Sequence, residues 1–82
     1  MLKSVEQLTK LWKDKKIGNH QVIQMSNNGR AFVYHQTVIC RTNESNKTFT
    51  TSNGGWNTRS TTVAINSYKK QLSSLGYTEV KA

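Results

Sequence analysis

The 82-residue sequence is poor in cysteine, proline and acidic residues. Cys40 is the only cysteine, so no disulfide can form within the chain, and the first ten residues, MLKSVEQLTK, lack the apolar run of a signal peptide. No stretch approaches the roughly 20 apolar residues that are needed to cross a bilayer. From these absences we expect a cytoplasmic protein that does not enter the membrane.

The chain is also short, and 34% of its residues are hydrophobic. A chain of this size buries only about 60 to 65% of the surface that it exposes when unfolded. Two tryptophans, three tyrosines and two phenylalanines still provide enough apolar surface for a small core. We therefore expect residues 1–82 to fold as a single domain.

Charge is the most unbalanced property of the sequence, because twelve lysines and arginines face four acidic residues and give a net charge of +8. A positive excess of this size attracts polyanions and speeds the encounter with them. The simpler interpretation is a hydrated surface that only favours solubility. Nucleic acid is the polyanion that we expect.

Apolar spacing predicts a first helix over residues 5–16. Val5, Leu8, Leu11 and Trp12 fall on one stripe of this helix, and lysines lie on the opposite side.

The dipeptide at residues 28–29, Asn-Gly, is typical of a two-residue β-hairpin turn, because both residues tolerate a positive φ. In that register Met25 opposes Phe32 and Ile23 opposes Tyr34, and these side chains form the apolar face of the sheet. We expect the second strand to be unbroken, with Val38 and Cys40 on the same face. Phe49 joins them from a third strand at residues 47–52.

A second helix is expected after the sequence NGGW, capped by Thr58 or Ser60 and ended by Gly76. Its predicted buried stripe is Thr61, Ile65, Tyr68, Leu72 and Leu75. Tyr77 is placed to fold back on the last turn, and residues 77–81 are open to a short final strand. The fold predicted is a two-layer α+β domain, in which a three-stranded antiparallel sheet carries both helices on one face.

Catalytic and metal-binding residues are not expected. His20 and His35 come out on the outer face of the predicted sheet and Cys40 on the other, so a third metal ligand is missing. The four acids are scattered, and none is predicted beside a histidine. We expect a protein that is not an enzyme and that needs no cofactor.

Nucleic-acid binding is the predicted function, through phosphate contacts without strong sequence choice and with DNA and RNA both open. Asn57, Arg59 and Ser60 stand at the positive N-terminal end of the second helix, where a phosphate is favoured. Arg30 and Arg41, at the two ends of the long strand, add further positive charge. The full set of predicted nucleic-acid-binding residues is Lys10, Lys13, Arg41, Asn57, Arg59, Ser60, Lys69 and Lys70.

Stacking of bases on an open sheet is disfavoured, because the predicted register turns Phe32, Tyr34 and Phe49 inward. Trp56 is expected to be buried against Tyr68 or Leu72, with contact to a partner as the alternative.

From residue 32 to about residue 72 the chain resembles small uncharacterised proteins of tailed bacteriophages. The resemblance consists of a strand of the type Y-x-x-T-x-I at residues 34–39 and a W-x-T-x-x-T-T approach to a helix at residues 56–62. It implies a phage product that acts in the cytoplasm of a bacterial host.

Small phage proteins often bind and inhibit a host enzyme, so the second hypothesis is a phage-encoded inhibitor or adaptor that docks on an acidic host protein. Self-association as a homodimer through the outer face, with Val22, Val33 and Ile39, is compatible with either function.

Overall fold

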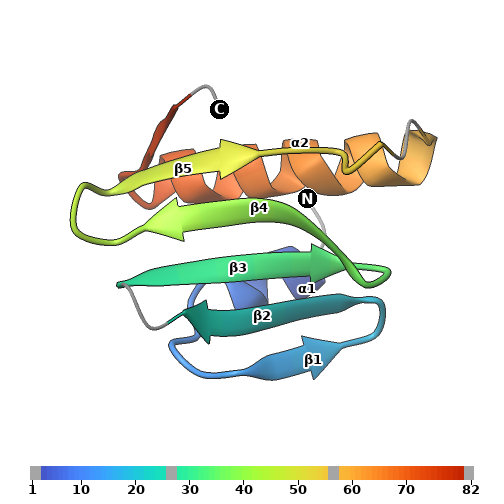
Figure 1. The fold of residues 1–82 in the computed structure, drawn as a ribbon, viewed down its shortest axis with the longest axis horizontal. Helices are drawn as coiled ribbons and strands as arrows, with labels where there is room; N and C mark the ends of the chain where they lie inside the picture. Colours follow the sequence, from blue (N-terminus) through green and yellow to red (C-terminus); the bar gives the residue numbers. More distant parts are fainter. Residues whose placement is uncertain (1–2, 26–27, 56–57, 81–82) are drawn as a thin grey trace.

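The sheet of this protein is a meander of short strands with one parallel strand added at its end. The computed structural model describes residues 3–25, 28–55 and 58–80. Its elements, in chain order, are α1 (Lys3–Leu8), β1 (Lys15–Ile17), β2 (His20–Met25), β3 (Gly29–Tyr34), β4 (Thr37–Asn43), β5 (Thr48–Thr51), α2 (Arg59–Ser74) and β6 (Thr78–Glu79). These strands form one sheet in the order β1-β2-β3-β4-β5-β6 (Figure 1). The first five pair antiparallel with their chain neighbours, whereas β6 is parallel to β5.

The α+β class is confirmed, but the prediction of a three-stranded antiparallel sheet is wrong, since the described strands form a six-stranded mixed sheet. One cause is a tight turn inside the strand that the sequence predicts as unbroken. His35 and Gln36 have φ values of 50° and 67°, and Tyr34 pairs with Thr37 across them. Two successive residues with positive φ are the geometry of a type I′ hairpin turn. Neither residue is glycine or asparagine, so the sequence gives no local signal for it.

The first hairpin has a different register from the predicted one. Met25 pairs with Gly29 instead of Phe32, and the partner of Phe32 is Val22. Asn28 has the positive φ of 55°, whereas Gly29 already belongs to β3. Because the shift from residue 32 to residue 29 is an odd number of positions, β2 presents its other face to the core. Val22, expected on the outer face, is fully buried, and Met25 is 45% exposed.

A β-bulge in β4 brings two consecutive side chains into the core. Phe32 pairs with Cys40, but the next residue, Val33, pairs with Val38, so that Ile39 is the extra residue. Ile39 and Cys40 are both buried in the core cluster. The expectation that Ile39 and Val22 form an outer face for self-association is therefore wrong. A bulge of this kind also bends the strand and increases its twist.

The first helix is much shorter than the predicted range of residues 5–16, because α1 ends at Leu8. The Thr9 hydroxyl donates to the carbonyl of Val5 at 2.9 Å and satisfies part of the helix end. Val5 and Leu8 are buried as predicted. Trp12, expected on the same buried stripe, lies beyond the helix and is 52% exposed.

The second helix agrees well with the sequence pattern. Thr58 is its N-cap, and the Thr58 side chain accepts a hydrogen bond from the backbone N–H of Thr61 at 3.3 Å. After the last turn the backbone N–H of Tyr77 donates to the carbonyl of Leu72 at 3.0 Å, and Tyr77 is buried in the core. Two residues of the predicted stripe differ, because Leu75 is exposed and Ile65 is only partly buried. The buried residues of α2 are Thr61, Ala64, Ser67, Tyr68, Gln71 and Leu72.

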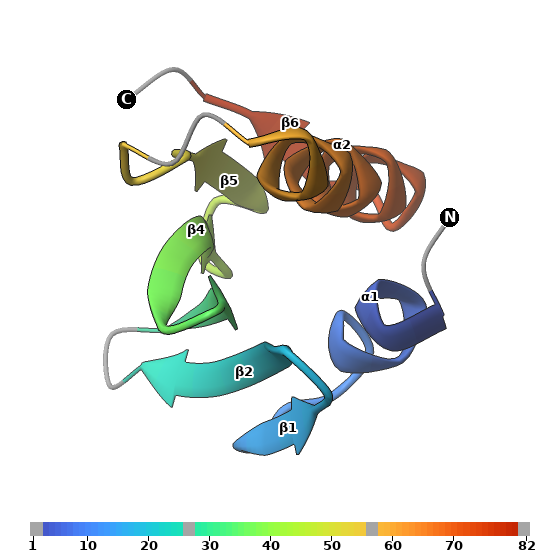
Figure 2. The same cartoon turned by 90° about the vertical axis from the view of Figure 1, so that its right-hand side faces the viewer.

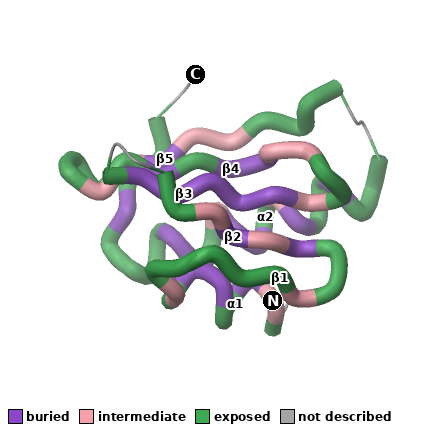
Figure 3. The backbone as a smooth tube through the Cα atoms, turned by 60° about the horizontal axis from the view of Figure 1, so that its bottom comes forward, coloured by how far each residue is buried: buried purple, intermediate pink, exposed green. Residues whose placement is uncertain are grey.

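Both helices lie on the concave side of the strongly curved sheet (Figure 2). The core fills the space between them, and β3 is buried along most of its length whereas β1 is largely exposed (Figure 3). Strand alternation turns Ile23, Ala31, Val33 and Val38 to the convex face, on the side of the sheet away from both helices. Ala31 and Val33 are buried there, whereas Ile23 and Val38 are partly exposed. Ile23 and Val38 were expected on the core face. Trp56, whose burial the sequence predicts, lies outside the described residues.

Candidate nucleic-acid interface

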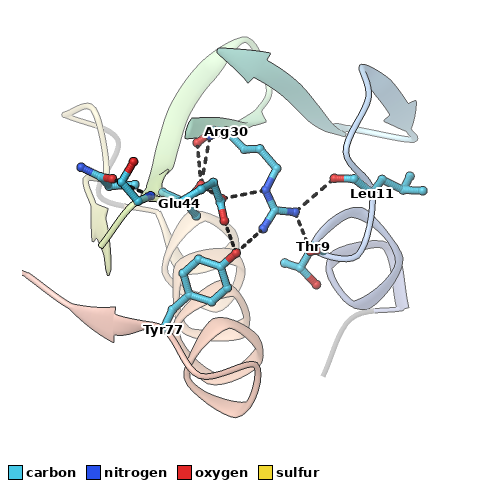
Figure 4. A network of polar contacts seen from close by, with 8 residues as sticks. Thr9, Leu11, Arg30, Glu44 and Tyr77 are labelled. Carbon is cyan, nitrogen blue, oxygen red and sulfur yellow. Dashed lines mark hydrogen bonds and ion pairs between the residues drawn. The ribbon is translucent and has the colours of Figure 1, made fainter. Parts of the chain in front are cut away.

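Arg30 is a fully enclosed cation at the end of the sheet where β3 begins, with only 1% of its surface exposed. Its Nε donates to Oε2 of Glu44 at 3.0 Å, and its Nη2 donates to the hydroxyl of Tyr77 at 3.0 Å. Its Nη1 donates to the carbonyls of Thr9 and Leu11 at 2.6 and 3.1 Å, just beyond the end of α1 (Figure 4). One guanidinium therefore joins α1, β3, the β4–β5 turn and the segment before β6.

Aromatic rings cover the flat faces of the same guanidinium. The Cζ atom of Arg30 lies 4.2 Å from the centre of the Trp12 ring and 5.4 Å from that of Phe32. Such cation–π contacts favour a charged group that has lost its water. From the sequence, Arg30 is expected among the surface cations. This expectation is wrong, because a phosphate cannot reach the buried side chain without opening the core.

Glu44 is the acid that balances this buried charge. Burial tends to raise the pKa of Glu44, but hydrogen bonds from Thr42, Tyr77 and Arg30 outweigh burial and hold the pKa below its usual value. Burial, followed by the hydrogen bond to Glu44, raises the pKa of Tyr77, so the phenol stays protonated and donates. The Arg30–Glu44 pair is thus ionised at neutral pH and carries no net charge.

The acidic side chains of this protein are all engaged within the described structure. Their contacts are Glu6 with Lys10, Asp14 with the backbone N–H of Gln24, Glu44 with Arg30, and Glu79 with Lys69. The described cations outside any of these ion pairs are Lys3, Lys13, Lys15, Lys16, Arg41, Lys47, Arg59 and Lys70. The positive excess therefore belongs to the surface.

Two of the predicted binding residues come together at the start of α2. Arg59 and Ser60 are its first two residues, and both are exposed. Lys69 and Lys70 lie about 15 Å further along the helix axis, since they follow Arg59 by ten and eleven residues. Lys69 is held by Glu79 at 3.3 Å. Asn57 lies outside the described residues.

The remaining predicted residues lie elsewhere on the molecule. Arg41 pairs with Ala31 and is exposed on the convex face, on the opposite side of the sheet from the helices. Lys10 and Lys13 follow α1, and Lys10 lies 3.9 Å from Glu6. The structure thus divides the predicted site among four places instead of gathering it at the start of α2.

A cavity of about 360 Å³ opens beside the start of α2. Tyr34, His35 and Ile39 line it together with four residues that carry aliphatic hydroxyl groups. The residues that contribute these hydroxyls are Thr37, Thr58, Ser60 and Thr61. Thr58 and Ser60, the sequence neighbours of Arg59, both line this cavity.

The histidines and the cysteine do not form a metal site in the part of the chain that the structure describes, where no three His, Cys, Asp or Glu side chains come together. His20, expected on the outer face, points into the core, with its Nδ1 3.3 Å from the Tyr68 hydroxyl and its ring against Tyr34. Burial, and then the nearby charge of His35, lower the pKa of His20. Burial raises the pKa of Cys40 to about 12, so its thiol is not activated.

Within residues 3–25, 28–55 and 58–80, neither helix has the length and apolar character needed to cross a membrane. Comparisons of the chain with known protein families, with characterised proteins and with solved structures found no match.

Proposed function

We propose that this chain is a small, non-enzymatic nucleic-acid-binding protein that holds phosphates electrostatically and without strong sequence choice. The observation that carries the proposal is the distribution of its charges. The acids are engaged in internal contacts, whereas eight described cations have no acidic partner. A surface of this kind attracts a polyanion and releases its counterions.

The start of α2 is the part of the surface best equipped to hold a phosphate. Arg59 supplies a charge, Ser60 supplies a hydroxyl, and the helix presents its positive end there. Such contacts position a backbone and carry no sequence information. Arg41, Lys13 and Lys70 extend the positive surface to other sides of the molecule.

A salt titration tests this proposal directly. We expect the affinity for a short DNA or RNA duplex to fall steeply between about 50 and 200 mM salt. The double substitution Arg59→Ala with Lys70→Ala is expected to reduce the slope of log K against log salt by about two, with no change in sequence preference. An affinity that stays flat over this range of salt would exclude the proposal.

A matched control separates local contacts from net charge. Lys10→Ala with Lys69→Ala removes the same two charges, but from cations that Glu6 and Glu79 already hold. We expect this control to weaken binding less than the variant of Arg59 and Lys70. Equal losses in the two double variants would show that total charge, and not the cations of α2 that have no acidic partner, determines the affinity.

The sequence resemblance to tailed-bacteriophage proteins supports a proposal about the setting. We propose that the chain is phage-encoded and acts on nucleic acid in the cytoplasm of a bacterial host.

The second candidate function is that of an inhibitor or adaptor that docks on an acidic host protein. The convex face favours it, because Ile23 and Val38 are partly exposed on the side of the sheet away from both helices, and Arg41 adds a positive charge there. This candidate predicts a stoichiometric acidic protein that is retained from bacterial lysate after nuclease treatment and is lost with Arg41→Glu. Analytical ultracentrifugation of the parent protein and of the Arg41→Glu variant shows whether the convex face binds a second copy of this chain instead.

A further inference from the structure

Trp12 is the one exposed aromatic ring among the tryptophans, tyrosines and phenylalanines that the structure describes. Its side chain is 52% exposed, whereas Phe32, Phe49, Tyr68 and Tyr77 are buried. In a chain with so little apolar surface, an indole of this size is a large loss to the core. Arg30 occupies only one face of the Trp12 ring. The exposed part of the ring is therefore accessible to a binding partner.

The segment that carries Trp12 is fixed on both sides of the ring. The carbonyls of Thr9 and Leu11 accept hydrogen bonds from Arg30, and the carboxylate of Asp14 accepts the backbone N–H of Gln24 at 2.9 Å. The ring itself rests 4.2 Å from the Arg30 guanidinium. A flat partner would therefore meet an aromatic surface that is already in place, at a low cost in conformational entropy.

Positive charge lies close to this ring. Lys13 follows it directly in the sequence and is exposed. The Nζ of Lys47 lies 4.9 Å from the centre of the Tyr77 ring, and the Tyr77 hydroxyl accepts a hydrogen bond from the same guanidinium that Trp12 covers. Asp14 is the nearby acid in the sequence, and its carboxylate is engaged by Gln24.

A fixed aromatic face beside cations is the arrangement with which proteins bind single-stranded nucleic acid, because each base offers a flat face and each phosphate a negative charge. In a duplex the flat faces of the bases are stacked on one another, so only base edges and the sugar-phosphate backbone are accessible. We propose that Trp12 is a stacking platform for an unpaired nucleobase, with Lys13 and Lys47 as contacts for the adjoining phosphates. This inference rests on the proposed function and narrows it to a preference for single strands.

Titration of labelled oligonucleotides against variants of the full-length chain tests the platform. The probes are an oligothymidylate of about 15 nucleotides, which matches the site size of small single-strand-binding domains, and a hairpin duplex of the same charge. Trp12→Leu keeps an apolar cover over Arg30 but has no flat face, whereas Trp12→Phe keeps one. Val63→Ala truncates an apolar side chain of α2 that is 46% exposed, close to the value for Trp12, and is the control.

We expect Trp12→Leu to weaken single-strand binding about tenfold or more, Trp12→Phe to restore most of it, and duplex binding to stay unchanged in both. Thermal unfolding of each variant shows whether the cover over Arg30 is intact. Unchanged single-strand affinity in Trp12→Leu, or a loss that follows thermal stability and affects both probes alike, would overturn the platform and leave the proposed function standing. Absence of salt-dependent binding to either probe would remove both.

Discussion

Arg30 and Arg41 lie on neighbouring strands of one sheet but on opposite faces of it. Arg30 pairs with Thr42, and Arg41 pairs with Ala31, one step further along the same ladder. The first is enclosed by the core and an acid, and the second is exposed on the convex face. Their positions in the pleat, and not their chemistry, decide which cation belongs to the fold and which to the surface.

Different energies govern the two positions. A guanidinium that leaves water must regain its lost hydration from partners, and Arg30 does so through Glu44, Tyr77 and two backbone carbonyls. Arg41 keeps its water and contributes to the field around the molecule. Substitutions at the two sites should therefore affect different properties.

Arg30→Met is expected to have the largest effect, a loss of about 3–5 kcal/mol in the free energy of unfolding, because it leaves Glu44 buried without its counter-charge. Arg41→Met removes the same side chain from the convex face and should change stability by no more than about 0.5 kcal/mol. Urea unfolding followed by circular dichroism measures both. Similar losses of unfolding free energy in the two variants would show that Arg30 is not more enclosed than Arg41.

Glu44→Gln is expected to cost less, about 1–3 kcal/mol, since the amide still accepts a hydrogen bond but no longer balances Arg30. The pH dependence sharpens this comparison. The pKa of Glu44 is lowered in the folded protein, so its contribution is complete above the ordinary pKa of 4.5 and is lost as pH falls through the folded value. Melting temperatures between neutral and acid pH should show this loss in the parent protein but not in Glu44→Gln.

His20 is a third basic side chain of the sheet, and it faces the core without an acid, so a smaller effect is expected there. Its pKa is lowered from 6.5, which means that the unfolded chain binds a proton first. Stability should be complete above pH 6.5 and decline as the pH falls below it. His20→Phe should remove this decline, and His35→Asn, in the exposed turn, should retain most of it. An unchanged pH profile in His20→Phe would contradict this account.

Arg41→Ala is expected to have the smallest effect, a reduction of about one in the salt dependence of nucleic-acid binding with unchanged stability. The measurement is the slope of log K against log salt, compared with that of the parent protein. If the slope stays the same, the convex face does not contact nucleic acid, and its exposed arginine is available to a protein partner instead.

The parts of the fold that the sequence predicts correctly depend on local signals. The second helix follows from its apolar stripe and from Thr58 at its start, and Tyr77 folds back on the last turn as expected. The strands that the sequence does not predict depend on contacts with residues far away in the chain. β1 forms where a helix is predicted, because α1 ends early and Arg30 binds the carbonyls that follow it. That interaction spans about twenty residues and leaves no trace in local periodicity.

The burial of Arg30 and the exposure of Trp12 were harder to predict than the fold. One signal was present, because Arg30 has the same strand parity as Phe32 and Tyr34, which places it on the apolar face even in the register expected from the sequence. A charged residue on such a face needs a partner, and Glu44 is the acid that follows β4. The exposure of Trp12 could not be predicted in this way, since it depends on where α1 ends.

The Arg30 network also constrains the order in which parts of the chain can fold. Hairpins between neighbouring strands can form early. The hydrogen bond from the Arg30 guanidinium to the Tyr77 hydroxyl, however, joins residues that are 47 positions apart in the sequence. Until the segments that carry Thr9, Leu11 and Tyr77 dock, Arg30 lacks most of the partners that replace its water in the core, so the core around it cannot close at low cost. Folding is therefore cooperative, and a chain truncated before Tyr77 should behave as a substrate for proteases instead of as a smaller version of the protein.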